Sequence, residues 1–505
     1  MKNIFILFLF LSVNAFSQAG SFDATFDTDG KNTYCFPPVT HNSLDSGLQS
    51  NGKIVYFGVN SLSCAVDLVR FNSDGSLDTT FGSNGASINS ICSAFPNVGY
   101  YPQQMAIQSD NKIIIMGLQQ NSTYPNAYWI ARLTPDGALD TAFNGTGFKD
   151  LSFGTVQDRG LCIALQADGK ILVGGTSGST AEFFTVARLT TTGALDTTFG
   201  IGGKAQVAFS GTESMANSIL VQPDGAILLG GYTVNAPYAR DFALVRLLSN
   251  GSIDTSFGVN GKVITTVDSN YSDAITQLAL QSDGKIVAGG FTSFETNTRM
   301  AVVRYLSNGN IDTTFGTNGI NVITDGFGGQ NCSVAVQADN KIIIAGGWQG
   351  GYFEVFRFLN SGTLDTAFGT NGLVNAFPVT GGYASKVLIQ PDNKIVVCGS
   401  SRSADFTGSC ASVIRLNPGT LAKDSFSNSI VSLFPNPTTG LVSFDNSINS
   451  FENVIIYNYL GQEVSKQKLN SISDSQINLS DFSNGVYLLK FIGENNNSVA
   501  RVVKE

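Results

Sequence analysis

The chain has 505 residues, of which 55 are glycine and 13% are charged, and its net charge is −9. Charged residues make up about a quarter of an ordinary soluble protein, so charge is scarce here. The acidic balance argues against nucleic acid and anionic membrane surfaces as partners, and the many Gly, Ser, Thr, Val and Ile residues favour strands and tight turns over helices.

Residues 1–17 predict a secretory signal peptide. Lys2 is followed by an apolar run at 4–11 and by small residues near Ala15 and Ser17. The apolar run is too short to span a bilayer, and no later segment offers 18 continuous apolar residues, so no transmembrane span is expected. We expect the mature chain to begin near Gln18.

Residues 18–416 are predicted to contain seven copies of one structural unit. A signature of the form QxDGKIxxGG and a short apolar run around Arg recur at similar intervals. The Asp-Gly or Asp-Asn pair supplies the positive φ that a two-residue hairpin needs. Four short strands per unit, without helical periodicity, predict a β-propeller. A further signature marks the fourth strand and reads FDATFD at 22–27, LDTTFG at 77–82, LDTAFN at 139–144, LDTTFG at 195–200, IDTSFG at 253–258, IDTTFG at 311–316 and LDTAFG at 364–369.

The order of the strands along the chain predicts how the ring closes. When the strands of one unit are named a, b, c and d, the mature chain begins with a lone strand d at 22–36, and the repeat region ends with strands a, b and c. The seventh blade is therefore expected to take its fourth strand from the N-terminus, which removes two exposed sheet edges. The predicted fold is all-β, a seven-bladed propeller closed by an N-terminal strand.

Each unit carries one Arg on strand c and one Asp at the start of strand d. The rival interpretation is seven identical anion sites, but a partly buried Arg needs a carboxylate partner, because an unpaired buried charge costs several kcal/mol. We expect the structural pairs Arg70–Asp78, Arg132–Asp140, Arg188–Asp196, Arg246–Asp254, Arg304–Asp312, Arg357–Asp365 and Arg415–Asp23.

The three signatures together resemble the delta-60 repeat, a bacterial β-propeller module of this period. The resemblance covers residues 22–424. That family is defined by sequence and has no assigned chemistry, so the resemblance implies a fold and not an activity.

After Leu416 the composition changes to a Pro, Ser and Asn linker at 417–428, and residues 429–505 are predicted to form a small C-terminal β-sandwich of short strands. This segment resembles a type A sorting domain of the type IX (Por) secretion system. The resemblance implies a Bacteroidetes cell, Sec export, translocation by the type IX machinery, and a secreted or outer-membrane surface protein whose tail is removed. The matching positions are Pro435, Asn436, Pro437, Thr438, Gly440, Gly461, Val464, Gly485, Val486, Tyr487, Arg501 and Lys504.

Catalytic constellations are scarce in the sequence. The single histidine, His41, lies in a predicted polar loop, which excludes a His-cluster metal site and disfavours a Ser-His-Asp triad. No catalytic residue, cofactor or metal ligand is assigned, although carboxylate pairs for glycoside chemistry stay open. We expect a monomeric, non-catalytic binding or scaffold protein that engages a glycan or a protein. The alternative is a propeller hydrolase or lyase acting on extracellular polysaccharide, which convergent carboxylates, Tyr and Arg from different blades would favour.

The b–c and d–a loops are predicted to share one face and to vary between copies, whereas the a–b and c–d turns are uniform. Variable loops on a rigid frame usually carry function, and an aromatic, weakly charged face suits glycan or peptide contacts. The alternative is that these aromatic residues begin strand c and pack inside the blades. The candidate ligand-binding residues are Tyr124, Tyr128, Trp129, Tyr232, Tyr238, Phe291, Trp348 and Tyr352.

The seven cysteines predict disulfides, because an exported protein meets an oxidising compartment. Both Cys64–Cys92 and Cys35–Cys410 would bridge neighbouring strands c and d in the same way, leaving Cys162, Cys332 and Cys398 unpaired. The rival pairing is Cys398–Cys410 across strands b and c.

Overall fold

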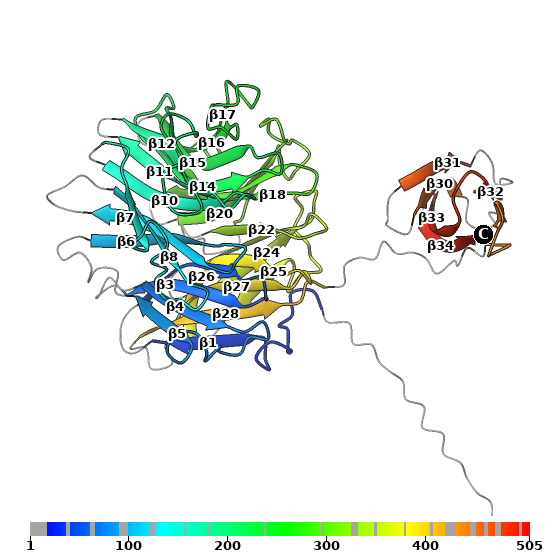
Figure 1. Cartoon of the computed structure of the whole chain (residues 1–505), viewed down its shortest axis with the longest axis horizontal. Coiled ribbons are helices and arrows are strands. Elements are labelled where there is room, and N and C mark those ends of the chain that lie inside the picture. Colours follow the sequence, from blue (N-terminus) through cyan, green and yellow to red (C-terminus); the bar gives the residue numbers. More distant parts are fainter. Residues whose placement is uncertain are drawn as a thin grey trace, which may run out of the picture. The chain divides into compact units, whose positions relative to one another are not determined.

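Figure 1 shows the computed structural model of the chain, which divides into two units, Met1–Gly419 and Thr420–Glu505. Each unit is described by itself. The part of the chain that the structure describes contains no apolar helix of membrane-spanning length. The described residues are 18–36, 41–60, 66–89, 99–120, 127–155, 157–178, 181–236, 239–269, 271–294, 297–324, 332–347, 351–377, 380–403, 408–419, 431, 433–444, 451–458, 463–469, 476–493 and 497–505.

Within its described residues, the first unit contains seven antiparallel four-stranded sheets, which confirms the predicted propeller. Blade 1 consists of β2 (His41–Leu48), β3 (Ile54–Asn60), β4 (Val66–Phe71) and β5 (Ala86–Asn89), and blade 2 of β6 (Gly99–Ile107), β7 (Ile113–Gln120), β8 (Ala127–Leu133) and β9 (Phe148–Leu151). Blade 3 consists of β10 (Gln157–Leu165), β11 (Ile171–Gly178), β12 (Glu182–Leu189) and β13 (Lys204–Val207), and blade 4 of β14 (Ser214–Val221), β15 (Ile227–Ala236), β16 (Ala239–Leu247) and β17 (Lys262–Thr265). Blade 5 consists of β18 (Ser272–Leu280), β19 (Ile286–Phe294), β20 (Asn297–Tyr305) and β21 (Ile320–Val322), and blade 6 of β22 (Ser333–Val336), β23 (Ile342–Gly346), β24 (Phe353–Phe358) and β25 (Leu373–Ala376). Blade 7 consists of β26 (Thr380–Ile389), β27 (Ile395–Arg402), β28 (Ser409–Leu416) and β1 (Lys31–Cys35).

The core lies between neighbouring blades, because each sheet is covered on both faces. Strand c is therefore apolar along its whole length, as in β4, in which every residue is buried. Phe81 shows how strand d contributes, since it packs with Leu68 of its own blade and Ile115 of blade 2. The equivalent phenylalanines, which we expected between blades, are all fully buried; they are Phe26, Phe81, Phe143, Phe199, Phe257, Phe315 and Phe368.

In blades 3, 4 and 5 the second glycine of the strand b pair lies beside the inner strand a, close to a β-bulge of that strand. In blade 4 the bulge lies between Ala216 and Ser218. A Cβ atom on Gly231 would lie only 1.8 Å from the carbonyl oxygen of Met215. No side chain fits at that distance, so the close approach of the two backbones fixes glycine at this position.

The predicted Arg–Asp pairs are confirmed in all seven blades. In blade 5 the Arg304 Nε atom donates to Asp312 Oδ2 at 2.8 Å, and the guanidinium carbon lies 4.6 Å from the ring centroid of Phe315. Both charged side chains are buried, at 2% and 4% exposure. The other pairs have Nε–Oδ2 distances of 2.6–2.9 Å and are Arg70–Asp78, Arg132–Asp140, Arg188–Asp196, Arg246–Asp254, Arg357–Asp365 and Arg415–Asp23.

Each of these arginines also binds the next blade. Arg246 of blade 4 donates from Nη1 to the carbonyl oxygen of Ser307 in the c–d turn of blade 5, at 2.6 Å. The last arginine, Arg415 of blade 7, donates in the same way to Ser73 of blade 1 at 2.6 Å. The remaining bonds run from Arg70 to Pro135, Arg132 to Thr191, Arg188 to Ser249, Arg304 to Asn360 and Arg357 to Pro418.

The inner strands are joined by a second set of bonds between blades. Ser218 Oγ of blade 4 accepts the backbone N–H of Leu278 of blade 5 at 3.0 Å. Asp45 of blade 1 accepts the N–H of Met105 of blade 2 at 3.1 Å, and its other oxygen lies 2.9 Å from Lys386 Nζ of blade 7. A buried ion pair therefore lies between the first and last blades on the inside of the ring.

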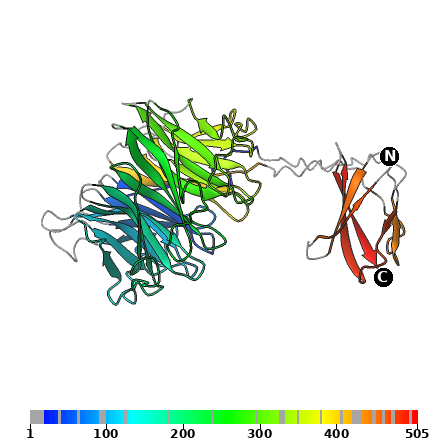
Figure 2. The ribbon, with the colours of Figure 1, turned by 90° about the horizontal axis from the view of Figure 1, so that it is seen from above.

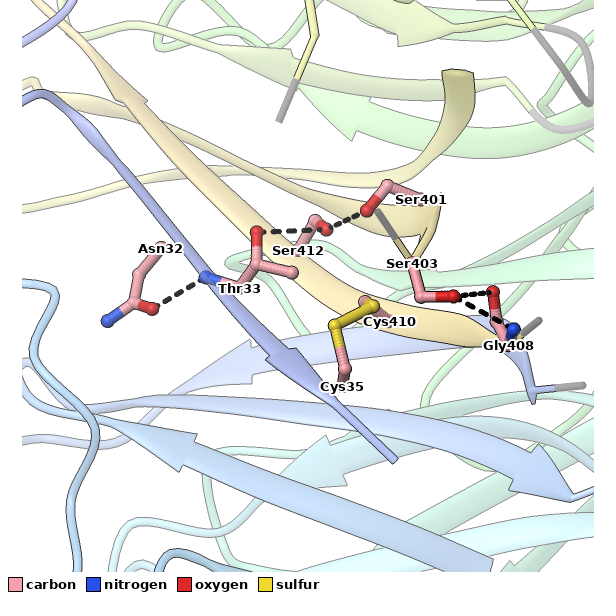
Figure 3. The surroundings of a disulfide bond; sticks show 8 residues. All are labelled: Asn32, Thr33, Cys35, Ser401, Ser403, Gly408, Cys410 and Ser412. Carbon is pink, nitrogen blue, oxygen red and sulfur yellow. Dashed lines mark hydrogen bonds between the residues drawn. A yellow bond between two sulfur atoms is a disulfide. The ribbon is translucent and has the colours of Figure 1, made fainter. Parts of the chain in front are cut away.

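The N-terminal segment supplies the fourth strand of blade 7. β1 pairs with β28 over its whole length, from Lys31 opposite Ile414 to Cys35 opposite Cys410 (Figure 1). In Figure 3 the Cys35–Cys410 disulfide joins the two strands, beside the hydroxyl contact of Ser412 with Thr33 at 3.4 Å. This predicted disulfide is confirmed, with an S–S distance of 1.99 Å.

The other cysteines divide into two groups. Cys162, Cys332 and Cys398 are buried and unpaired among the described residues, so the rival Cys398–Cys410 pairing was wrong. Cys64 and Cys92 lie outside the described residues.

The turn between strands c and d of blade 7 is built from two distant pieces of the chain. In blade 5 the corresponding turn is continuous, and Leu306 N donates to Asn310 O at 2.8 Å. In blade 7, Asn417 N donates to Ser21 O at 2.8 Å, and Gly20 N donates back to Asn417 O at 2.8 Å. Residues 417–419, which we assigned to the linker, therefore take part in the propeller.

The second unit contains a four-stranded sheet, ordered β31-β30-β33-β34, and a two-stranded sheet, β29-β32 (Figure 2). Both sheets contribute to one core, in which Val442 and Ile477 pack with Val454, Leu489 and Phe491. This arrangement is the predicted small β-sandwich. Its strands are β29 (Leu441–Ser443), β30 (Phe451–Tyr457), β31 (Glu463–Lys468), β32 (Gln476–Asn478), β33 (Gly485–Gly493) and β34 (Asn497–Lys504).

We expect the substitution Asp312→Asn to destabilise the propeller by about 3 kcal/mol, because it leaves the buried Arg304 guanidinium without its carboxylate. Urea unfolding measures the change. Asp283→Asn is the matched control in the same blade, since Asp283 is 39% exposed and lies 3.5 Å from Lys285. Its expected effect is below about 0.5 kcal/mol. Equal losses in the two variants would contradict a structural role for the buried pair.

Acid should weaken the same pairs. Burial opposes ionisation of Asp23 and Asp312, but hydrogen bonds and the paired arginines outweigh burial and lower the pKa of each to about 2. The unfolded carboxyl has a pKa of about 3.9, so the stabilisation is present above about pH 4 and is lost as the pH falls towards 2. We expect the melting temperature to fall steeply from pH 4 to 2, and less steeply in Asp312→Asn. A melting temperature that stays constant down to pH 2 would refute this.

Thiol counting tests the disulfide that lies outside the described residues. Burial raises the pKa of Cys332 and of Cys398 to about 12 and also raises that of Cys162, so none should react with a thiol reagent in the folded protein. In denaturant without reductant, we expect only those three thiols to react, which is the count that the predicted Cys64–Cys92 disulfide requires. Reaction of five thiols would show that Cys64 and Cys92 are free.

Candidate ligand-binding face

The two faces of the propeller use their charges differently. The propeller has two faces, which are formed by the two ends of its strands. We call the face with the a–b and c–d turns the turn face. The opposite face carries the b–c loops and the connections from strand d to strand a of the next blade, and we call it the variable face. On the turn face the ring arginines are paired, and lysines join them: Lys53 lies 2.7 Å from Asp78, and Lys394 lies 2.6 Å from Asp23. These paired charges of the turn face therefore stabilise the propeller itself.

On the variable face, equivalent positions differ between blades. A residue that the frame requires should recur, because the seven copies share one environment. Tyr232 of β15 instead aligns with Val59, Leu118, Thr176, Phe291, Gly347 and Ser400. Arg240 of β16 aligns with Glu182, Thr298, Gly351 and Ser409.

Blades 3 and 4, which are neighbours in Figure 1, bring five polar side chains together on this face. We call this group the blade 3–4 cluster. It consists of Arg159 on β10, Glu182 on β12, Glu213 immediately before β14, Tyr232 on β15 and Arg240 on β16.

Tyr232, Glu213 and Arg240 form one rigid unit within the cluster. Tyr232 Oη and Arg240 Nη2 both donate to Glu213 Oε1, the latter at 3.0 Å. The Arg240 guanidinium lies 4.3 Å from the Tyr232 ring centroid, over a ring that is only 4% exposed. Burial, and then the bond to Glu213, raise the pKa of Tyr232, so the phenol stays protonated as a donor. The side chains of Arg240 and Glu213 are 41% and 37% exposed, so this unit presents charged groups to solvent.

Glu182 completes the cluster with an unsatisfied acceptor. Its Oε2 atom is buried and has no hydrogen-bond partner among the described residues. Burial raises the pKa of Glu182; the charge of Glu213 adds to the rise, while Arg159 and Arg240 oppose it. Two carboxyl groups in different electrostatic environments therefore lie in one cluster.

Of the five predicted aromatic candidates that the structure describes, three are buried: Tyr128, Trp129 and Tyr232. Tyr128 and Trp129 are buried, at 0% and 1% exposure. Tyr128 Oη meets Thr185 Oγ1 of blade 3 at 2.5 Å, and Trp129 Nε1 donates to Leu118 O at 3.1 Å. Both residues pack inside the blades, as the alternative interpretation expected, because they lie on strand c.

The remaining candidates have varied positions. Tyr232 supports the cluster, and Phe291 is half-buried on β19. Tyr124, Tyr238 and Trp348 lie outside the described residues. His41, expected in a loop, is the first residue of β2.

Among the described candidates, Tyr352 is the exposed one, and it lies beside a second exposed ring that the sequence analysis missed. Tyr352 precedes β24, Phe377 follows β25, and their ring centroids are 4.0 Å apart. They are 38% and 42% exposed and their planes are tilted by 47°, so blade 6 presents a tilted aromatic pair on the variable face. The available signal for Phe377 was its place at the end of strand d, on the same face as Tyr352.

A groove of about 760 Å³ lies between the segment before β14, strand β17 of blade 4 and the c–d turn of blade 5. Its lining includes Phe209, Val259, Ile264 and Lys262. Lys262 Nζ donates to Ala208 O at 2.6 Å, and Ser210, Thr265 and Asn310 add polar side chains to the lining.

Two families match this chain. The domain of unknown function (DUF5122) beta-propeller matches residues 49–81, 108–143, 166–199, 222–257, 281–315, 337–368 and 390–424. The secretion system C-terminal sorting domain matches residues 432–505. The chain is a DUF5122 β-propeller with a type IX sorting domain. Both predicted resemblances are thereby confirmed, and the sorting domain indicates export by type IX secretion to the cell surface or the extracellular space.

Solved structures with the same general fold are distant from this DUF5122 propeller. A catalytically inactive virginiamycin B lyase from Staphylococcus aureus is 11% identical, with a TM-score of 0.45 over 76% of this chain and 98% of that chain. The polysaccharide lyase Uly1 is 14% identical, with a TM-score of 0.42 over 76% and 91%. Likeness at this level carries no argument about activity. No curated protein matches the chain.

In the sorting domain, Asn436 fixes the loop that contains the predicted residues Pro435 to Gly440. The Asn436 side chain donates to Arg501 O at 2.8 Å and accepts the N–H of Val503 at 2.9 Å, so it holds the loop against β34. Pro435 and Pro437 flank it, each after a cis peptide bond. Gly440 faces Ser480, where a Cβ atom would lie 2.5 Å from Oγ. Gly485 begins β33, Tyr487 is buried on β33, Lys504 is buried at the end of β34, and Gly461 lies outside the described residues.

Proposed function

We propose that this exported propeller binds a glycan through its variable face without transforming it. The observation that carries the proposal is the exposed aromatic pair of Tyr352 and Phe377. Aromatic rings are favoured inside a protein, so two contacting rings that are both partly exposed leave adjoining apolar surface uncovered. The C–H faces of a sugar ring are flat and weakly apolar, and they match such a surface.

The division of labour between the faces supports the same proposal. The turn face repeats its Arg, Asp and Lys contacts from blade to blade, whereas the variable face differs at Tyr232, Arg240 and their equivalents. A rigid frame with one variable face is a common design for recognition. The sorting domain adds a second partner, the type IX secretion machinery, which is independent of this face.

A hydrolase or lyase is the alternative, and one specific observation favours it. The blade 3–4 cluster joins two carboxyl groups, a tyrosine and arginines from two blades, and Glu182 has the raised pKa that suits a general acid. Against this, the Tyr232 phenol donates to Glu213 and stays protonated, and Arg240 is bound to the same carboxylate. These contacts describe a positioned binding group better than an activated base.

We expect Tyr352→Ala to weaken glycan binding roughly tenfold, equivalent to about 1.4 kcal/mol, because it removes one of the two exposed aromatic rings. The full exported chain would be screened against immobilised polysaccharides and the hit measured by calorimetry. Tyr352 is exposed, so folding should be unaffected. Leu248→Ala is the matched control, since Leu248 is 44% exposed and lies in the c–d turn of blade 4 on the turn face.

Each other outcome has a definite meaning. Release of shorter or unsaturated products from any glycan would overturn the binding-only proposal in favour of the enzyme. Unchanged affinity in Tyr352→Ala would remove the aromatic pair from the binding site. If the variable face bound a protein and no glycan, the ligand would be a protein, and the glycan proposal would be wrong.

A further inference from the structure

We infer that the blade 3–4 cluster is a second contact site on the variable face, and that its ligand is an uncharged saccharide with adjacent hydroxyl groups. This inference rests on the proposed glycan binding and adds the position of a polar subsite and the class of glycan.

The cluster has balanced charge. Its carboxyl groups, Glu182 and Glu213, are matched by the guanidinium groups of Arg159 and Arg240. An anionic polymer approaching the arginines would meet the carboxylates, and a cationic one would meet the arginines. Complementary potentials favour binding, so this cluster favours a ligand without net charge.

Asp241 does not alter this balance directly. It follows Arg240 on β16, and successive residues of a strand point to opposite faces of the sheet. Arg240 turns towards Tyr232, whereas the charge of Asp241 acts on Asp273 of blade 5. Asp241 therefore belongs to the interface with the next blade.

The unused atoms of the cluster alternate between donors and acceptors. The hydrogen bonds of Glu213 both use Oε1, so within the described residues Oε2 is unoccupied. Among the described residues, Glu182 Oε2 has no partner, and the guanidinium groups of Arg240 and Arg159 each donate one side-chain hydrogen bond, from Nη2. A hydroxyl group both donates and accepts, and neighbouring hydroxyls on a sugar match the paired atoms of carboxylate and guanidinium groups. Ammonium or carboxylate ligands could satisfy only one kind of atom.

The cluster is also held in position before a ligand arrives. The buried Tyr232 hydroxyl fixes Glu213, and its ring supports Arg240 at 4.3 Å. Long side chains that are already ordered lose less entropy on binding. A ligand hydroxyl that reaches Glu182 Oε2 would in addition satisfy a buried acceptor that now lacks a partner.

The test compares matched polysaccharides that differ only in charge, using the full chain. Suitable pairs are dextran with dextran sulfate, and methyl-esterified pectin with polygalacturonate. We expect the neutral member to bind, with affinity that changes less than twofold between 0.05 and 0.5 M NaCl, because no net charge is neutralised. Glu213→Gln, which keeps the shape of the side chain, should weaken that binding at least tenfold.

Two further variants separate the cluster from general effects. Tyr232→Phe removes the hydroxyl that positions Glu213 and should weaken binding less than Glu213→Gln does. Asp283→Asn removes an exposed carboxylate on the turn face and should leave affinity unchanged.

The outcomes distinguish this inference from the proposed function. Preference for the charged member with steep salt dependence would overturn the neutral class but leave glycan binding intact. Neutral binding that Tyr352→Ala weakens and Glu213→Gln does not would overturn the second site alone. Absence of binding to every glycan would overturn the proposed function and this inference with it.

Discussion

The propeller depends on one repeated contact, the arginine that joins strand c to strand d and then to the next blade. In blade 4, Arg246 pairs with Asp254, lies 4.6 Å from the Phe257 ring centroid, and donates to Ser307 of blade 5. A guanidinium group suits this position, because it is planar, always charged and carries several donors. Since the same geometry recurs, each blade is positioned against the next in the same way. The arginine of blade 7, Arg415, donates its interblade hydrogen bond to Ser73 O of blade 1, which closes the ring.

This use of charge also decides where recognition can occur. The turn face contains most of the paired charges, and altering them would damage the frame. Residues of the variable face do not make these repeated contacts between blades, so they can differ from blade to blade, as Tyr232 and Arg240 do from their equivalents. The aromatic pair of Tyr352 and Phe377 and the blade 3–4 cluster both lie on this variable face.

Much of the fold could be predicted from the sequence, because seven copies repeat every structural requirement. The Arg–Asp pairs, the interblade phenylalanines and the Cys35–Cys410 disulfide all followed from the alignment of copies. The candidate site was harder to predict. Tyr128 and Trp129 lie on a strand covered on both faces, so no alternation of polar and apolar residues distinguishes inside from outside. The cluster was missed because its members are spread from Arg159 to Arg240, and each is unremarkable in its own segment.

The divided turn of blade 7 shows that the repeat along the sequence and the blade in the structure do not have the same boundaries. The propeller begins and ends inside one turn, where a Cβ atom on Gly419 would lie 2.5 Å from that of Ala19. Each segment from one such turn to the next therefore carries strand d of one blade and strands a, b and c of the following blade. Duplication or loss of one whole segment in the gene would keep the donated strand, the split turn and the order of the remaining contacts. Ring size in such a protein can thus change by recombination between repeats without any change in how the ends meet.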